Sequence, residues 1–187
     1  MKGIIFKYDA NPSRWSDLRD GADNGCGLED PDFSTNGFPV WAICGPYARK
    51  GVKPGDTLFF VPKMKGLREA GLGDRGYFCT GILCVAEIVG DEQTLQRDNR
   101  FSEAYKRKYT SSLKDHLRGD KERTKGIRPY GIVVGDPGSS RWLGREGYSK
   151  AHAFREVGLT HEDLSARRVS YLGPEQAARL YELLLGS

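Results

Sequence analysis

The sequence predicts an α+β domain in which helices pack against a curved, mostly antiparallel sheet. Short apolar runs rich in β-branched and aromatic residues recur through the first half of the chain and again near residue 130, a pattern typical of strands. Residues 101–117 and 174–185 instead carry apolar side chains at three- and four-residue steps, which is typical of amphipathic helices. A chain of 187 residues fits a single domain with one core.

The strands of the first half are predicted from three apolar runs, at residues 2–8, 57–62 and 77–89. The second run follows the tetrapeptide KPGD, in which Pro54 fixes φ and Gly55 allows a positive φ. A tight turn is therefore expected to lead into a strand at Thr57. Gly81, inside the third run, is the expected position of a β-bulge.

Residues 13–37 are rich in Gly, Asp, Asn and Pro and have neither strand nor helix periodicity, so they predict a long loop. A loop of this length either closes over a ligand or forms a mobile connection, and both interpretations stay open. Residues 66–76 are glycine-rich and predict a hairpin connection or a flap. They lack the spacing of dinucleotide-binding and P-loop motifs, so no cofactor is expected.

A basic helical segment is predicted at residues 97–128. It contains eleven Lys or Arg against five Asp or Glu, a net charge of +6, whereas residues 1–48 have a net charge of −3. The basic side chains and the apolar stripe occupy different faces of the expected helix. A solvated helix face and a surface that tracks phosphates are both consistent with this pattern.

The second half continues with a predicted strand at residues 127–134 and a turn, GDPG, at residues 135–138. Ser139-Ser140-Arg141-Trp142 follows directly. Such a group could stack a base and contact a phosphate, or Trp142 could close one end of the core. Pro174 begins a C-terminal amphipathic helix whose apolar stripe is expected to pack on the sheet.

Several of these stretches resemble the EVE branch of the PUA-like superfamily. The segment 45–49 (GPYAR), followed by 52–60 (VKPGDTLFF), is similar to the short helix, turn and aromatic strand of that group, and 81–89 (GILCVAEIV) is similar to its next strand. A related likeness, to the nucleotide-modification-associated domains, involves the 44–56 turn together with Tyr8, Asp9, Asn11 and Pro12. The resemblance covers residues 3–90 and implies a PUA-like, partly closed β-barrel with packed helices.

The resemblance also implies a function. It points to a nucleic-acid-binding module, for DNA or RNA, that recognises a flipped or unpaired modified base in an aromatic pocket at the barrel mouth. The expected stacking residues are Trp41, Tyr47, Phe60 and Trp142. The expected partners of the base edge are Asn11, Asp136 and Ser140. The expected phosphate contacts are Arg49, Lys50, Lys63, Lys65 and Arg141.

A second hypothesis is a small hydrolase or modifying enzyme acting on a modified nucleobase or nucleoside, because some PUA-like relatives hydrolyse modified nucleosides. Such an enzyme needs an acid or base with a shifted pKa inside a pocket, and Glu87 and Asp9 are candidates. No nucleophile–base pair is recognisable, so catalytic residues are unknown and binding is the preferred interpretation. The spacings of the four cysteines and the isolated histidines predict no metal site.

The location is predicted to be cytoplasmic. The sequence start, MKGIIFKYD, lacks the apolar region and cleavage site of a signal peptide. No apolar run approaches the ~18 residues that a membrane span requires. A membrane partner is therefore not expected.

Overall fold

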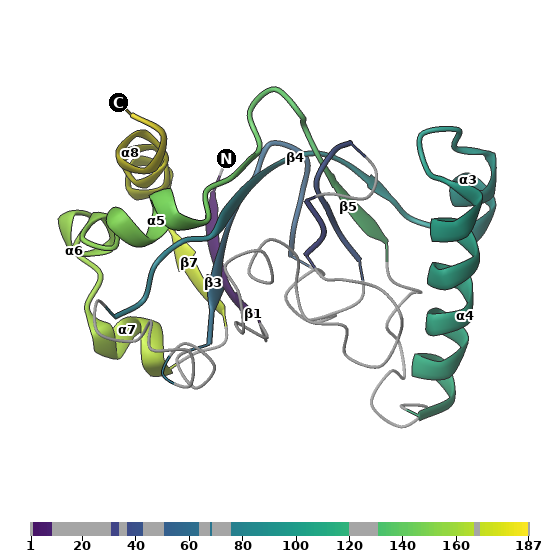
Figure 1. Cartoon of the computed structure of the whole chain (residues 1–187), viewed down its shortest axis with the longest axis horizontal. Helices are drawn as coiled ribbons and strands as arrows, with labels where there is room; N and C mark the ends of the chain where they lie inside the picture. Colours follow the sequence, from purple (N-terminus) through teal and green to yellow (C-terminus); the bar gives the residue numbers. More distant parts are fainter. Residues whose placement is uncertain are drawn as a thin grey trace.

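The computed structural model describes residues 2–8, 31–33, 37–42, 51–63, 68, 76–119, 131–166 and 169–186, except the side chains of 112–119 and 166. In this part of the chain, strands form a sheet with helices at both ends (Figure 1), which confirms the α+β class. The elements are β1 (Gly3–Tyr8), β2 (Val40–Trp41), β3 (Thr57–Pro62), β4 (Gly81–Val89), α3 (Glu92–Arg97), α4 (Glu103–Gly119), β5 (Ile132–Gly135), β6 (Arg141–Trp142), α5 (Arg145–Ser149), α6 (Ala153–Glu156), α7 (His161–Ala166), β7 (Val169–Leu172) and α8 (Pro174–Leu185).

The sheet is mixed. The described strands follow the order β2-β5-β4-β3-β1-β7, with β6 paired to β4. β1 and β3 are parallel, and the other pairings among the described strands are antiparallel. The expectation of a mostly antiparallel sheet is thus confirmed. Within the described residues the sheet does not close on itself, and β2 and β7 lie at its two ends.

Both faces of the central strands are buried, which explains their nearly continuous apolar sequences. On one face, Ile5 and Phe59 pack in a cluster that includes Leu180 of α8. On the other face, Phe6 and Phe60 belong to a second cluster. The predicted first and second strands are confirmed as β1 and β3, because alternate side chains of each strand supply the two clusters.

The predicted KPGD turn is confirmed. Gly55 has a φ of +86°, a conformation that glycine adopts without steric cost. The Asp56 carboxylate accepts hydrogen bonds from the backbone N–H of Lys53 at 3.0 Å and of Lys2 at 3.1 Å. The turn therefore holds the start of β3 beside the start of β1.

The third predicted strand is shorter than expected, since β4 begins at Gly81 and not at residue 77. Its irregularity is also elsewhere: the β4–β5 register shifts between Val85 and Glu87, so the prediction of a bulge at Gly81 is wrong. Gly81 serves close packing instead, because a Cβ there would lie 2.6 Å from the ring of Phe33.

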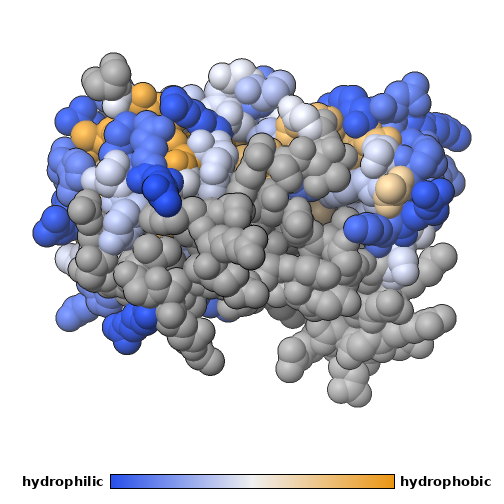
Figure 2. Space-filling view, in the orientation of Figure 1, coloured by the Kyte–Doolittle hydropathy of each residue, from blue (hydrophilic) through white to orange (hydrophobic). Residues whose placement is uncertain are grey.

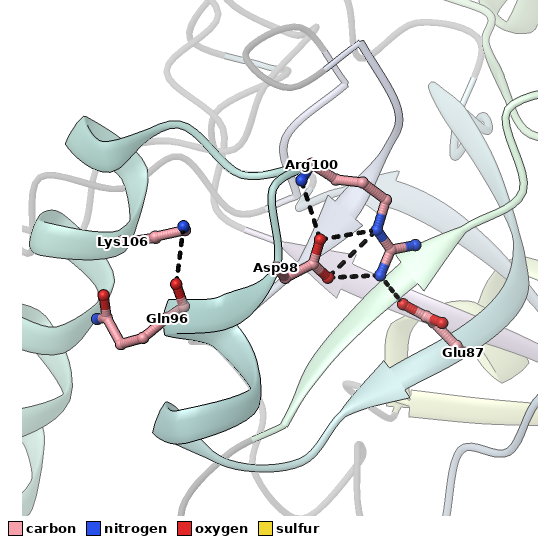
Figure 3. A network of polar contacts seen from close by, with 5 residues as sticks. All are labelled: Glu87, Gln96, Asp98, Arg100 and Lys106. Atoms are coloured by element: carbon pink, nitrogen blue, oxygen red, sulfur yellow. Dashed lines mark hydrogen bonds and ion pairs between the residues drawn. The ribbon is translucent and has the colours of Figure 1, made fainter.

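Within the predicted basic segment 97–128, residues 103–119 form the helix α4, which packs with α3 at one end of the sheet, and residues 120–128 lie outside the described residues. Phe101, Tyr105 and Tyr109 are buried against the β2–β5 region. A polar network fixes the pair to the sheet (Figure 3): Arg100 pairs with Asp98 and with Glu87 of β4, and Lys106 Nζ donates to the Gln96 carbonyl at 3.0 Å. Two cations of the basic segment, Arg100 and Lys106, thus help to hold the helices and the sheet together.

The other end of the sheet is covered by α5 to α8 (Figure 1). The predicted C-terminal helix is confirmed as α8, and its buried residues Ala177, Leu180 and Leu184 face the core. The buried Lys7 of β1 donates from Nζ to the Leu164 carbonyl and, at 3.2 Å, to the Ser165 carbonyl of α7. This lysine therefore ties α7 to the sheet.

The described part of the face in Figure 2 is mostly hydrophilic, with small apolar areas between polar side chains. Among the described helices, none combines the length and the apolar character that crossing a bilayer demands.

Candidate functional site

The predicted site residues are only partly described. Asp9, Asn11, Tyr47, Arg49, Lys50 and Lys65 lie outside the described residues, as does most of the predicted 13–37 loop and of the 66–76 connection. The described candidates fall into three groups: aromatic residues of the sheet, polar residues after β5, and two cations.

The aromatic candidates belong to one connected set of rings. The ring centroids of Trp41 and Phe60 are 5.8 Å apart, and Phe33 lies 6.0 Å from both Phe60 and Trp142. Trp41 and Phe60 are fully buried, whereas Trp142 is half-buried. In the described structure, Trp41 and Phe60 pack the core, and Trp142 is the predicted stacking residue that keeps accessible surface.

The polar candidates lie at a pocket of about 430 Å³, which we call the Tyr181 pocket. This volume is within the range of small-molecule sites. Four segments meet there: the KPGD turn with the start of β3, the middle of β4, the turn after β5, and α8. The lining residues are Gly55, Thr57, Cys84, Val85, Asp136, Ser139, Ala177, Ala178, Tyr181 and Glu182.

The Ser139 carbonyl links two walls of the Tyr181 pocket. It accepts a hydrogen bond from the Tyr181 hydroxyl at 3.0 Å and one from the Cys84 thiol at 3.4 Å. Burial raises the pKa of the Tyr181 phenol, and negative charge at Cys84 or Asp136 acts in the same direction. Tyr181 therefore stays a neutral hydrogen-bond donor near neutral pH.

Asp136 supplies the negative charge of the turn. Its Oδ2 accepts hydrogen bonds from the Ser139 hydroxyl and, at 2.9 Å, from the Ser139 N–H. These bonds hold the pKa of the carboxyl below its usual value. Because a carboxylate has about four acceptor positions, the charged group retains capacity for a ligand donor.

Ser140 has a structural role beside the pocket. Its Oγ accepts a hydrogen bond from the Cys84 N–H in the middle of β4 at 2.9 Å, which joins the segment after the turn to this strand. Asp136 and Ser140 were both predicted to contact a base edge; Asp136 is in the lining of the Tyr181 pocket, whereas Ser140 is not.

The chemistry of the Tyr181 pocket favours a flat, partly apolar ligand that carries N–H donors. Val85, Ala177 and Ala178 give it an apolar surface, and Asp136 and Glu182 are its acidic residues; the Glu182 carboxylate also lies 3.5 Å from the Arg179 guanidinium. Two acidic residues and no Lys or Arg among the described lining residues disfavour a phosphate inside the pocket. A phosphate attached to the ligand would have to lie outside it.

The described cationic candidates lie on different strands. Arg141 is on β6, next to Trp142, and its guanidinium is 3.0 Å from a carboxylate oxygen of Glu146 while remaining 54% exposed. Lys63 follows β3, and its positive charge contributes to lowering the pKa of Lys7, after the larger effect of burial. Of these two candidates, Arg141 is the nearer in sequence to the Tyr181 pocket, two positions after the lining residue Ser139.

Glu87, the described candidate for acid–base chemistry, forms an ion pair away from the Tyr181 pocket. Glu87 pairs with Arg100 at the α3–α4 end of the sheet (Figure 3) and is absent from the lining of the Tyr181 pocket. Its carboxylate is 44% exposed. This setting differs from the enclosed pocket that a general acid or base with a shifted pKa requires.

Sequence reasoning missed Cys84 and Tyr181 as site residues. Tyr181 belongs to the apolar stripe of α8, and the helix periodicity assigned it to the core. Its hydroxyl was the available signal, because a buried tyrosine requires a hydrogen-bond partner at its polar end. That partner, Ser139, lies 42 positions away and is not visible in the helix pattern.

Comparison of the chain with protein-family models, with curated proteins and with solved structures found no match. The site is therefore interpreted from its own geometry and from the sequence resemblance described above.

Proposed function

We propose that this protein is a nucleic-acid-binding module that accepts a flipped or unpaired, modified base in the Tyr181 pocket. The sequence resemblance to EVE-like and nucleotide-modification-associated domains supports this assignment, and with it a PUA-like relationship of the sheet. The proposal moves the base from the buried aromatic residues of the sheet to the accessible space beside α8.

The observation that carries the proposal is the convergence of Asp136 and Tyr181 on one pocket of about 430 Å³. Recognition of a flipped base needs a confined space, an apolar contact surface and hydrogen-bonding groups for the base edge. The alanines of α8 supply the surface, and the Asp136 carboxylate supplies an acceptor.

The acceptors indicate which base edges fit. Asp and Glu accept hydrogen bonds from exocyclic amino groups, as in contacts with N4 of cytosine. Asp136 and Glu182 are both in the lining of the pocket. A modified cytosine or adenine that keeps an N–H donor is thus the favoured ligand, and a thymine-type edge fits less well.

The strand backbone of the nucleic acid would pass along β6. Arg141 and the half-buried Trp142 follow directly after the turn that carries Asp136 and Ser139. An arginine beside an accessible ring can contact a phosphate and stack a neighbouring base. Binding is expected to weaken as salt concentration rises, because phosphate contacts release counterions.

The experiment measures fluorescence anisotropy of labelled single-stranded oligonucleotides that differ only in one central base: cytosine, 5-methylcytosine, adenine, N6-methyladenine or thymine. Asp136→Asn should weaken binding of the preferred oligonucleotide about tenfold, since a hydrogen bond to a charged group contributes ~1.5–3 kcal/mol. Tyr181→Ala should reduce discrimination among the bases.

Asp163→Asn is the matched control. Asp163 also accepts hydrogen bonds from a neighbouring backbone N–H and hydroxyl, those of Thr160, but it does not line the Tyr181 pocket. This control should bind as the wild type does. Equal affinity for all oligonucleotides, or unchanged binding by Asp136→Asn, would reject the proposed function.

A further inference from the structure

A second pocket, of about 540 Å³, lies beside helices α6 and α7, and we call it the His161 pocket. Its lining includes Tyr77, His152, Arg155, Thr160 and His161. It shares no lining residue with the Tyr181 pocket. The two pockets are therefore separate sites on the helical end of the sheet.

Two stacked rings form part of the wall of the His161 pocket. The centroids of Tyr77 and His161 are 5.1 Å apart, with an angle of 29° between the ring planes. Lys7 Nζ lies 5.6 Å from the centroid of the Tyr77 ring. Because the carbonyls of α7 hold that ammonium, the tyrosine ring is supported from the sheet side and His161 is presented outward.

Arg155 supplies a cation that no other described group neutralises. Its side chain is exposed and, among the described residues, makes no ion pair or hydrogen bond. By contrast, Arg100, Arg141 and Arg179 each pair with a carboxylate. An unpaired guanidinium at a pocket is suited to bidentate contact with an oxyanion.

The charges around the His161 pocket favour an anion. Burial raises the pKa of the Tyr77 phenol, whereas the positive charge of Arg68 lowers it. Arg68 is therefore close enough to add positive charge on the Tyr77 side of the pocket. Arg155 is the one Lys, Arg, Asp or Glu among the described lining residues, because Glu156, Glu162 and Asp163 of the neighbouring helices are not part of the lining.

We propose that the His161 pocket binds a phosphate monoester attached to a planar ring system, with Arg155 holding the phosphate and His161 contacting the ring. A free nucleoside monophosphate and the phosphorylated end of a nucleic-acid strand share this chemistry. The inference is independent of the Tyr181 pocket, and it assigns the phosphate to a cationic site and not to the acidic one.

Isothermal titration calorimetry tests the inference with five ligands: inorganic phosphate, adenosine 5′-monophosphate, adenosine, and a tetranucleotide with and without a 5′-phosphate. Adenosine 5′-monophosphate should bind at least about tenfold more tightly than adenosine, as expected for a charge-assisted contact to phosphate. Tighter binding of the 5′-phosphorylated tetranucleotide than of the mononucleotide identifies a strand end as the ligand, and the reverse order identifies a free nucleotide.

Arg155→Gln should weaken binding of the phosphorylated ligands about tenfold. His161→Ala should lower the affinity for adenosine 5′-monophosphate and leave the affinity for inorganic phosphate unchanged. Arg107→Gln is the matched control, because Arg107 is an exposed arginine of α4 at the other end of the sheet. Circular dichroism verifies that each variant is folded, which is expected since both arginines are exposed.

Equal affinities for adenosine and its monophosphate would overturn the inference. So would an Arg155→Gln variant that binds phosphorylated ligands as tightly as Arg107→Gln does. Variants of the Tyr181 pocket should leave the mononucleotide affinity unchanged, so failure of this inference and failure of the proposed function give different results.

Discussion

Gly81 at the start of β4 faces the ring of Phe33 so closely that a Cβ at position 81 would lie 2.6 Å from the ring atom Cζ. The absent side chain allows Phe33 to lie between Phe60 and Trp142, at 6.0 Å from each ring. Gly81 thus determines how the buried rings of the sheet connect to the half-buried Trp142.

Gly81→Ala is expected to destabilise the protein by about 1–3 kcal/mol, the usual cost of forcing extra volume into a packed core. Phe33 would have to shift, and the position of Trp142 would change with it. Chemical denaturation measures the loss, and tryptophan fluorescence reports the change at Trp142. Gly90→Ala is the control, because a Cβ at Gly90 has no atom within 4 Å. Equal stability of the two variants would contradict this packing role.

Tyr181→Phe should destabilise the protein by about 0.5–1.5 kcal/mol, the net contribution of a typical hydrogen bond. The substitution removes the hydroxyl that donates to the Ser139 carbonyl at 3.0 Å and so frees the turn after β5 from α8. Thermal unfolding measures the effect. Tyr171→Phe is the control, since Tyr171 is 58% exposed. A Tyr181→Phe variant as stable as the control would show that the bond does not hold the turn.

The network of Figure 3 predicts a loss of stability in acid. Hydrogen bonds from Arg100 hold the pKa of Asp98 below its usual value, against the opposing effect of burial. The stabilisation is therefore fully present above the unfolded-state pKa of ~3.9 and is lost as pH falls through the lower folded-state pKa. Because Arg100 is 47% exposed, solvent screens the pair, and the contribution is about 1 kcal/mol.

Asp98→Asn tests this pH dependence. The difference in unfolding free energy between wild type and variant should be constant from pH 5 to 7 and should shrink as pH falls below ~4. Urea denaturation at each pH measures it. Glu92→Gln removes a carboxylate from the exposed first turn of α3, outside the network, and serves as the control. A difference that stays constant down to pH 2 would contradict the role of Asp98.

The sequence predicted the elements whose patterns are local. β1 and β3 are apolar on both faces, and α4 and α8 carry stripes at helical spacing. β1, β3 and α8 match their predicted ranges within one residue, whereas α4 covers residues 103–119 of the predicted segment 97–128. The predicted KPGD turn was confirmed by the positive φ of Gly55. These features depend on neighbouring residues, which a single sequence displays directly.

Features that depend on distant partners were not predictable in the same way. Lys7 is buried because the carbonyls of Leu164 and Ser165 accept its hydrogen bonds, more than 150 positions along the chain. Gly81 looked like a bulge because its packing partner Phe33 lies in a segment predicted as a loop. Trp41 was predicted to stack a base at the barrel mouth, but it is fully buried because its ring packs against those of Phe6 and Phe60.

The candidate site shows the same division. The turn after β5 was predicted from its composition and is present at residues 137–139. Asp136 was predicted to contact a base edge, and it lies in the lining of the Tyr181 pocket. The opposite wall of the pocket comes from α8, where Tyr181 looked like a core residue of an amphipathic helix. Only the packing of α8 on the sheet shows that its hydroxyl meets Ser139.

The two described cysteines should differ strongly in reactivity, and this difference gives a direct measure of occupancy of the Tyr181 pocket. Burial raises the pKa of Cys79 to about 12, so its thiolate is scarce near neutral pH. Cys84 is half-buried and lines the pocket. Iodoacetamide at pH 8, followed by peptide mass spectrometry, should modify Cys84 in the native protein and Cys79 only after unfolding.

A ligand in the Tyr181 pocket should protect Cys84 from the reagent. The oligonucleotide that binds most tightly in the anisotropy series should slow alkylation of Cys84 in proportion to occupancy, whereas adenosine 5′-monophosphate, directed to the His161 pocket, should leave the rate unchanged. The Cys84 thiol and the Tyr181 hydroxyl both donate to the Ser139 carbonyl, so a base between Asp136 and Tyr181 must cover the thiol. Fast alkylation of Cys84 at saturating oligonucleotide would therefore place the bound base elsewhere.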